Sequence, residues 1–479
     1  MRLDPTPTSG AGAMRAGVLL HTAPEAPGCG MGELTEAWRF RHPQDHSVTG
    51  CRRSLLAVLG AVVVFAVVVA ACGGGRGADG GGLVGGLGDG SLGVVVVEAG
   101  DAIQVRSLNT ITGDVAFFGL PIDRAARIAV DDYGPVHGFE VELGASLDDL
   151  CSNDGGQAAA QQIVADEDVV GVVGTSCSGA AVAAAPLITA AGMVLISGGN
   201  TSPALTSDLA GNPGPNYSVG YYRTTTNDLH QGAAMAAFVA GELGIATAAA
   251  VHDGDPYTQG LAQAFADAFE AKGGTVTGVF AVNKDDTDMV PALTEVATGG
   301  PGALFFPIFQ PAADFIADQA PSVAGLEKTV LVTADSLLNT NYLSLPQTTG
   351  IYFTGPDQRL GANVNQSTGR SAAGFLEEYE SRYGESPSSP FWVFGYDAAA
   401  LLLDAITAAS TIRDNNLVID RQGVRSHLNS VRGYNGLVGT LNCDDFGDCG
   451  AARLTVIQNL GGQDNVDASM NNVVFSYTP

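Results

Sequence analysis

The sequence predicts an α/β protein with two lobes, each built on a mostly parallel sheet that carries helices on both faces. Three observations lead to this prediction. The chain has 479 residues, of which 46% are hydrophobic, so it can bury more than one core. Short apolar strands alternate with amphipathic helices from Val94 onward. The alternation begins again after Arg223, which indicates a second lobe over roughly residues 227–355.

The N-terminal part of the chain has the order of features found in a secretory signal. Residues 1–50 are rich in Pro, Gly and Ala. Two arginines then precede an uncharged apolar run at residues 55–69, and small residues follow this run. A basic region, an apolar region and small residues before the cleavage point are typical of a signal peptide. We therefore expect residues 1–71 to be an upstream segment and a signal peptide, with a retained membrane anchor as the alternative.

The signal ends in Val-Ala-Ala-Cys, which resembles a bacterial lipobox. The resemblance implies that Cys72 is the lipid-acylated first residue of the mature protein. A glycine-rich segment follows at residues 72–93. No strand leads into this segment and no Gly-Lys-Ser/Thr follows it, so a phosphate-binding loop is disfavoured. We expect a flexible tether that spans roughly 25 Å between a lipid surface and the folded lobes.

Apolar periodicity places the elements of both lobes in order. In the first lobe, strands are expected at residues 94–97, 103–108, 139–143, 169–173 and 193–197, and helices at residues 121–131, 157–166 and 180–191. In the second lobe, strands are expected at residues 246–252, 276–282, 303–307 and 329–333, and helices at residues 228–241 and 260–271. Two further helices are expected at residues 375–383 and 391–408. Pro121 is expected at the first position of its helix, where its missing N–H leaves no gap.

Two loops of small residues follow neighbouring strands of the first lobe. One loop covers residues 174–179, and the other is Gly198-Gly199-Asn200-Thr201. Neighbouring parallel strands end at the same edge of a sheet, and α/β sheets bind ligands at that edge. The loops offer backbone N–H groups and hydroxyls beside a helix N-terminus, which suits a small anion such as a carboxylate.

Four cysteines follow Cys72 in the chain. They are Cys151, Cys177, Cys443 and Cys449. An even number in an exported chain favours disulfides, and the first two flank one unit of helix and strand while the last two bracket an acidic turn. The alternative is a zinc site, but the chain has no Cys-x-x-Cys pair and no histidine near either pair.

The composition disfavours several classes of partner and chemistry. The net charge of −28 argues against nucleic acid and anionic membrane surfaces as partners. Residues 174–179, Gly-Thr-Ser-Cys-Ser-Gly, do not fit the Gly-x-Ser-x-Gly pattern of serine hydrolases, and the histidines are scattered. We therefore expect no enzymatic activity, no cofactor and no metal site.

Several motifs occur in a characteristic order along the chain. They are TGDVAFFG at residues 112–119, the Cys151 to Cys177 spacing, GMVLISGGNTSPALT at 192–206, YRTTTND at 222–228, VHDGDPYTQGLA at 251–262 and FGYDAAALL at 394–402. With these motifs, residues 103–457 resemble the type I periplasmic binding proteins of ABC transporters, in particular the leucine/isoleucine/valine-binding family. The resemblance implies two Rossmann-like lobes joined by a hinge of three crossovers. It assigns residues 94–226 and 356–452 to the N-terminal lobe, and residues 227–355 and 453–479 to the C-terminal lobe.

The same resemblance implies a ligand site between the lobes. The ligand carboxylate is expected at Ser178, Gly199, Asn200 and Thr201, the ammonium at Asp335, and aromatic walls at Phe118, Tyr257 and Phe309. Asp335 stands where the family more usually has glutamate, and both phenylalanines stand where it often has tyrosine. The alternatives are an N-cap role for Asp335, core packing for the two phenylalanines and a turn role for Tyr257.

The predicted function is that of a lipid-anchored extracytoplasmic solute-binding protein of an ABC importer. It is expected to act as a monomer on the outer face of the cell membrane, to close around a small amino acid of the branched-chain type, and to deliver it to the permease. The alternatives are an amide or urea as the ligand, and a ligand-sensing module with the same fold.

Overall fold

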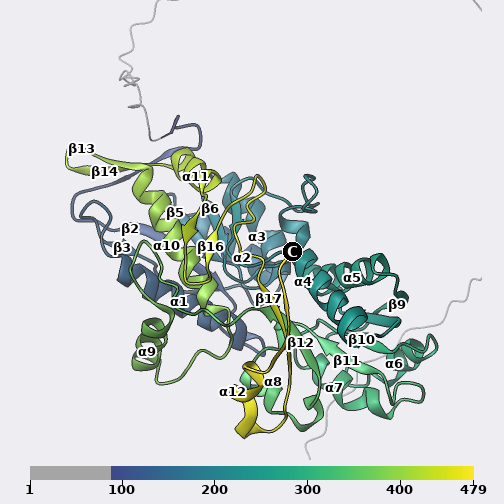
Figure 1. The fold of residues 1–479 in the computed structure, drawn as a ribbon. Coiled ribbons are helices and arrows are strands. Elements are labelled where there is room, and N and C mark those ends of the chain that lie inside the picture. Colours follow the sequence, from purple (N-terminus) through teal and green to yellow (C-terminus); the bar gives the residue numbers. More distant parts are fainter. Residues whose placement is uncertain (1–87) are drawn as a thin grey trace, which may run out of the picture. The chain divides into compact units, whose positions relative to one another are not determined.

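The computed structural model describes residues 88–479, and two large sheets organise this part of the chain (Figure 1). The predicted signal peptide, Cys72 and most of the predicted tether lie outside the described residues. Residues 88–93, at the end of the predicted tether, contact the first lobe, where the Gly90 N–H donates to the Asp420 carboxylate at 3.0 Å. No helix within residues 88–479 has the length and apolar character needed to cross a membrane.

The first sheet has six strands, all parallel, in the order β3-β2-β5-β6-β7, with β4 also paired to β2. Its strands and covering helices are β2 (Ile103–Asn109), β3 (Val141–Glu142), β4 (Leu147–Asp148), β5 (Val169–Gly174), β6 (Val194–Ser197), β7 (Tyr221–Arg223), α1 (Ala116–Tyr133), α2 (Asn153–Val164), α3 (Ser178–Ala190) and α10 (Trp392–Ala408). In β6, Val194 and Ile196 share a core with α1 and α10, whereas Leu195 shares a core with α2 and α3. Both faces are therefore buried, which explains the continuous apolar runs of these strands.

The second sheet has seven strands in the order β18-β17-β12-β11-β10-β8-β9, of which β17 and β18 are antiparallel additions at one edge. Its strands and covering helices are β8 (Thr247–His252), β9 (Thr275–Ala281), β10 (Ala303–Phe305), β11 (Val330–Thr333), β12 (Tyr352–Pro356), β17 (Leu454–Gln458), β18 (Val473–Tyr477), α4 (Asp228–Ala237), α5 (Pro256–Ala271), α6 (Val290–Ala297) and α7 (Ala312–Gln319). Helices α4 and α5 pack on one face, and α6 and α7 on the other. Each sheet thus has its own pair of cores.

Three connections join the two lobes. The first leads from β7 to α4, the second from β12 to α9 (Ala372–Tyr383), and the third from β16 (Thr440–Leu441) to β17. The predicted two-lobed α/β class with mostly parallel sheets is therefore confirmed. The remaining elements are β1 (Val94–Val97), α8 (Thr340–Ser344), β13 (Ser410–Arg413), β14 (Asn416–Asp420), α11 (Arg421–Ser430), β15 (Tyr434–Asn435) and α12 (Val466–Met470).

The predicted start of the first helix is wrong. Helix α1 begins at Ala116, and Pro121 lies inside it rather than at its first position. A proline there removes the N–H that would bond to the Phe117 carbonyl one turn earlier. The Ser388 hydroxyl donates to that carbonyl at 2.8 Å and so replaces the missing donor. Helix α1 therefore begins five residues before the predicted start, because a side chain from a distant segment satisfies the carbonyl that Pro121 leaves without a donor.

Candidate functional site

A small cavity lies where the carboxyl ends of the two sheets face each other. Its lining residues are Phe118, Ser176, Cys177, Ser178, Gly199, Thr201, Tyr257, Phe309, Asp335, Ser336 and Phe391. The predicted ligand-binding residues therefore come together from distant parts of the chain, with Asn200 as the exception. The free volume is about 10 Å³, which is the room of about one water molecule. The lobes are thus closed on the cavity.

The start of α3 forms one wall of the cavity and is held from behind by Asp149. The Asp149 carboxylate accepts the N–H groups of Ser176 and Cys151 at 2.8 Å each. A disulfide joins Cys151 to Cys177, directly before Ser178. No side chain caps the start of α3, so the N–H groups of its first turn are open to an anion. Burial raises the pKa of Asp149 to about 6.

The loop after β6 contributes Gly199 and Thr201 to the same wall. The Thr201 hydroxyl is buried and has no hydrogen-bond partner among the described residues, so it is available to a ligand. The backbone N–H groups of Gly199 and Asn200 donate to the Ser197 hydroxyl at 3.0 and 2.8 Å. The Asn200 side chain does not line the cavity: its oxygen accepts hydroxyl groups from Thr175 and Tyr221, at 3.1 Å each.

Asp335 forms the acidic wall of the second lobe. It follows β11, is buried, and accepts the Tyr257 hydroxyl at 3.0 Å through one oxygen. Its other oxygen has no hydrogen-bond partner within residues 88–479. Ala334, and not Asp335, occupies the N-cap of the short helix here, which disfavours the N-cap alternative for Asp335. Burial raises the pKa of Asp335 to about 6.

Asp228 is a second buried acid in this region, and the sequence did not identify it as a site residue. It is the first residue of α4. Neither carboxylate oxygen makes a hydrogen bond of good geometry in the described part of the chain, although the Thr201 hydroxyl lies close enough to favour the ionised form. Its backbone N–H donates to the Thr201 carbonyl at 3.0 Å. Burial and then the nearby charge of Asp335 hold the pKa of Asp228 well above its ordinary value. Its place at the end of the YRTTTND motif was the available signal.

A row of aromatic rings crosses from one lobe to the other beside these acids. Phe118 on α1 meets Phe391 with ring centres 4.5 Å apart and Phe309 with ring centres 5.9 Å apart. Phe309 in turn lies 5.4 Å from Tyr257. Phe391, which directly precedes α10, was not predicted for the site. The rings give the cavity an apolar side beside its polar ends.

Comparison with known proteins identifies the family. A family model described as "Periplasmic binding protein" matches residues 102–448. The chain belongs to the type I periplasmic binding proteins.

Relatives of this periplasmic binding protein have named ligands of more than one kind. A Leu/Ile/Val-binding protein homolog of Brucella melitensis is 25% identical, over 74% of this chain and 91% of the relative. The crystal structure of a leucine-binding protein from Thermotoga maritima matches with a TM-score of 0.64 at 25% identity, over 74% of this chain and 95% of that one. A Rhodopseudomonas palustris solute-binding protein in complex with 3,4-dihydroxybenzoic acid shares the fold, with a TM-score of 0.59 at 20% identity over 75% and 93%.

Proposed function

We propose that this periplasmic binding protein closes around a small α-amino acid of the branched-chain type and delivers it to the permease of an ABC importer. The observation that supports this most directly is the charge arrangement of the cavity, where an anion-binding wall faces an acidic wall. An α-amino acid carries a carboxylate and an ammonium on the same carbon, so it complements both walls at once. Recognition is complete only when both lobes contact the ligand.

In this proposal, the ligand carboxylate binds the N–H groups at the start of α3 and the hydroxyls of Ser178 and Thr201, beside Gly199 and Asn200. The helix N-terminus favours a negative charge at this position. The ammonium donates to Asp335, whose free oxygen is buried at the cavity. Asp228 provides the second negative charge behind Thr201.

The acidic wall supports an amine-bearing ligand over one that has only a carboxylate. Ligands without an amine leave both buried acids uncompensated, and a buried unpaired charge is costly. A second hollow of about 500 Å³ adjoins the cavity at Phe309. Five aspartates and one lysine line it, namely Asp114, Asp154, Asp253, Asp255, Asp285 and Lys284. The resulting negative potential also disfavours a net anion such as a benzoate.

The size of the cavity supports binding by closure. A free volume of about 10 Å³ cannot admit an amino acid, so the lobes must part before a ligand enters. We propose bending at the three crossovers between the lobe formed by residues 94–226 and 356–452 and the lobe formed by residues 227–355 and 453–479. An apolar ligand side chain then packs against Phe118, Phe309 and Phe391.

A thermal-shift panel tests the ligand class. The panel contains glycine, alanine, valine, leucine and isoleucine, with acetamide, urea and benzoate as members that lack one or both amino-acid charges. A bound ligand stabilises the folded state by about 2.7 kcal/mol at a hundredfold excess over its Kd. We expect the largest shift from an aliphatic amino acid. A shift from benzoate alone would contradict the proposal.

The same panel tests one of two alternatives, and an uptake experiment tests the other. The unpaired oxygens of Asp228 and Asp335 are also acceptors for the NH2 groups of an amide or urea, in which case acetamide or urea gives the largest shift. A ligand-sensing module of this fold shows the same shifts as a transporter subunit. Uptake of the radiolabelled ligand by cells that lack this protein separates the two, because only a transporter subunit is needed for uptake.

A further inference from the structure

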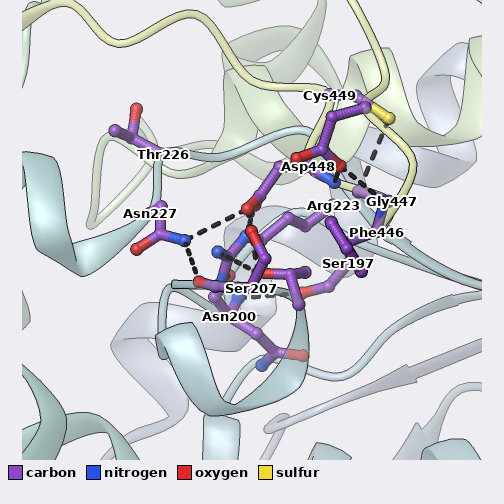
Figure 2. A network of polar contacts seen from close by, with 12 residues as sticks. Ser197, Asn200, Ser207, Arg223, Thr226, Asn227, Phe446, Gly447, Asp448 and Cys449 are labelled. Atoms are coloured by element: carbon purple, nitrogen blue, oxygen red, sulfur yellow. Dashed lines mark hydrogen bonds and ion pairs between the residues drawn. The ribbon is translucent and has the colours of Figure 1, made fainter. Parts of the chain in front are cut away.

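A buried ion pair lies behind the ligand site, where two of the three crossovers meet. Arg223 ends β7 and is fully buried, and its Nε donates to the carboxylate of Asp448 (Figure 2). Its other two nitrogens donate to the Ser202 carbonyl at 2.8 Å and to the Thr206 hydroxyl at 2.7 Å. Neither Arg223 nor Asp448 lines the cavity. The pair therefore acts on the site only through other residues.

The acidic turn at residues 443–449 fixes Asp448 in place. A disulfide joins Cys443 to Cys449, and the turn pairs with β7 through a parallel bridge between Arg223 and Asp448. The Arg223 N–H donates to the Gly447 carbonyl at 2.9 Å, and the Cys449 N–H donates to the Arg223 carbonyl at 3.0 Å. Gly447 has a φ of +84°, and a Cβ there would lie 2.1 Å from the Tyr221 carbonyl oxygen. The close approach of the turn to β7 thus requires glycine.

The ion pair reaches the ligand site by two routes. The Arg223 guanidinium donates to the carbonyls of Ser202 and, at 3.4 Å, Asn200, which flank Thr201 on both sides. The Asp448 carboxylate accepts the side-chain amide of Asn227 at 3.1 Å. Asn227 caps α4, whose first residue is Asp228. One pair of charges therefore holds the backbone on both sides of a ligand-facing hydroxyl and the cap of the helix that begins with Asp228.

We propose that the Arg223–Asp448 pair, closed by the Cys443–Cys449 turn, is a positioning element that sets the geometry of Thr201 and Asp228 for ligand binding. The role assigned to these two site residues rests on the proposed function. A charged donor binds peptide carbonyls more strongly than a neutral one, and its planar fork fixes their direction. Without Asp448, the buried guanidinium loses its counter-charge, so Arg223 holds the two carbonyls beside Thr201 less firmly.

The variant Asp448→Asn tests the proposal in the full chain. Hydrogen–deuterium exchange of the ligand-free protein should become several-fold faster in peptides that cover residues 198–203 and the start of α4, with other regions unchanged. Affinity for L-leucine should fall roughly tenfold. Affinity for L-leucinamide, which has no carboxylate, should fall less, because the Thr201 loop is proposed to bind the carboxylate of the ligand. A general loss of stability lowers both affinities equally.

Asp397→Asn is the matched control. The Asp397 carboxylate is also buried and accepts N–H groups from Leu437, Val438 and Asn365 at 2.8 to 3.0 Å, but it does not line the cavity. This variant should leave exchange at residues 198–203 and the leucine-to-leucinamide ratio unchanged. The double variant Cys443→Ser/Cys449→Ser keeps Asp448 and should give the same local exchange as Asp448→Asn.

The outcomes separate the two proposals. Unchanged exchange at residues 198–203 in both Asp448→Asn and the double serine variant overturns the positioning role, whatever the ligand is. Failure of the unmodified protein to bind L-leucine counts against the proposed function, and the exchange result still decides the positioning role because it needs no ligand.

Discussion

At the scale of single residues, the acidic wall carries a cost that a ligand relieves. Asp228 and Asp335 are buried, and three of their four carboxylate oxygens have no partner among the described residues. Arg223, whose positive charge acts on Asp228, is already paired with Asp448. Burial without a partner disfavours the ionised form of an acid, so the ligand-free closed state is destabilised by ionisation of these acids.

Asp335→Asn should therefore stabilise the ligand-free protein at pH 7 while it removes binding of an amine-bearing ligand. The folded-state pKa of Asp335 is about 6 and its ordinary value is 3.8. When the folded-state pKa of an acid is raised, the protonated acid contributes to the stability of the folded state. This contribution is fully present below the ordinary pKa and is lost as pH rises through the folded-state pKa. The variant should thus gain up to about 3 kcal/mol over the natural protein between pH 4 and pH 7.

Thermal unfolding of the ligand-free protein at pH 4 and pH 7 measures this difference. Asp267→Asn on the exposed side of α5 is the control, because Asp267 is exposed and contacts only Gln263 through its side chain. Its stability relative to the natural protein should not change between the two pH values. If the stability difference between Asp335→Asn and the natural protein were equal at both pH values, ionisation of Asp335 would not destabilise the folded state.

The sequence predicted part of the site at this scale. Five predicted residues follow strand ends or lie in the family motifs, namely Ser178, Thr201, Tyr257, Phe309 and Asp335. Their common location therefore follows from the sheet topology and the resemblance to the family. Asp228 and Phe391 were missed because each begins or directly precedes a helix. For Asp228, its place at the end of the YRTTTND motif was the signal that could have been used. Their placement depends on contacts with segments far away in the chain.

At the scale of elements, local signals sufficed where the chain satisfies its own backbone. The predicted strands and helix over residues 169–197 agree with β5, α3 and β6 to within two residues, because apolar runs and glycines mark their limits. The prediction of where α1 begins was wrong because Ser388, which is far away in the sequence, supplies the donor that Pro121 lacks. The β13–β14 hairpin had a usable signal: Asp414 and Asn415 form its turn with φ of 49° and 68°, as expected for a tight hairpin.

The two disulfides should differ in their contribution to stability because they close loops of different length. Cys151 and Cys177 are separated by 26 residues, and Cys443 and Cys449 by 6. The loss of chain entropy in the unfolded state gives about 3.5 kcal/mol for the longer loop and about 2 kcal/mol for the shorter one. Guanidinium unfolding of the two double serine variants measures both values. A larger loss from the shorter loop would point to native contacts instead of loop closure.

At the scale of the whole molecule, specific contacts join the lobes across the cavity. They include the Phe118–Phe309 ring contact and the Ser202 hydroxyl, which donates to the Pro256 carbonyl at 3.0 Å. These contacts can break without loss of either pair of cores, since each sheet buries its own faces. Opening of the lobes is therefore compatible with the stability of each lobe.

The proposed anchor is tested by where the protein is found in the cell. Cys72→Ser removes the sulfur that would be acylated, so the variant should leave the membrane fraction or remain as an unprocessed precursor. Cys51→Ser is the control, because it changes a cysteine that does not follow the small residues of the signal. Fractionation with an antibody against the protein gives the measurement. If the Cys72 variant stays in the membrane fraction at its mature size, the anchor lies elsewhere.

The second and third connections between the lobes also determine when each lobe can fold during synthesis. Helix α10 fills a core of the first lobe although it is made after most of the second lobe. Strand β17, near the end of the chain, pairs with β12 and lies inside the second sheet. Neither lobe can complete its cores until the ribosome has made nearly the whole chain. A chain built in this order stays incompletely folded until late. This agrees with the secretory signal predicted from the sequence, because an exported chain crosses the membrane before it folds.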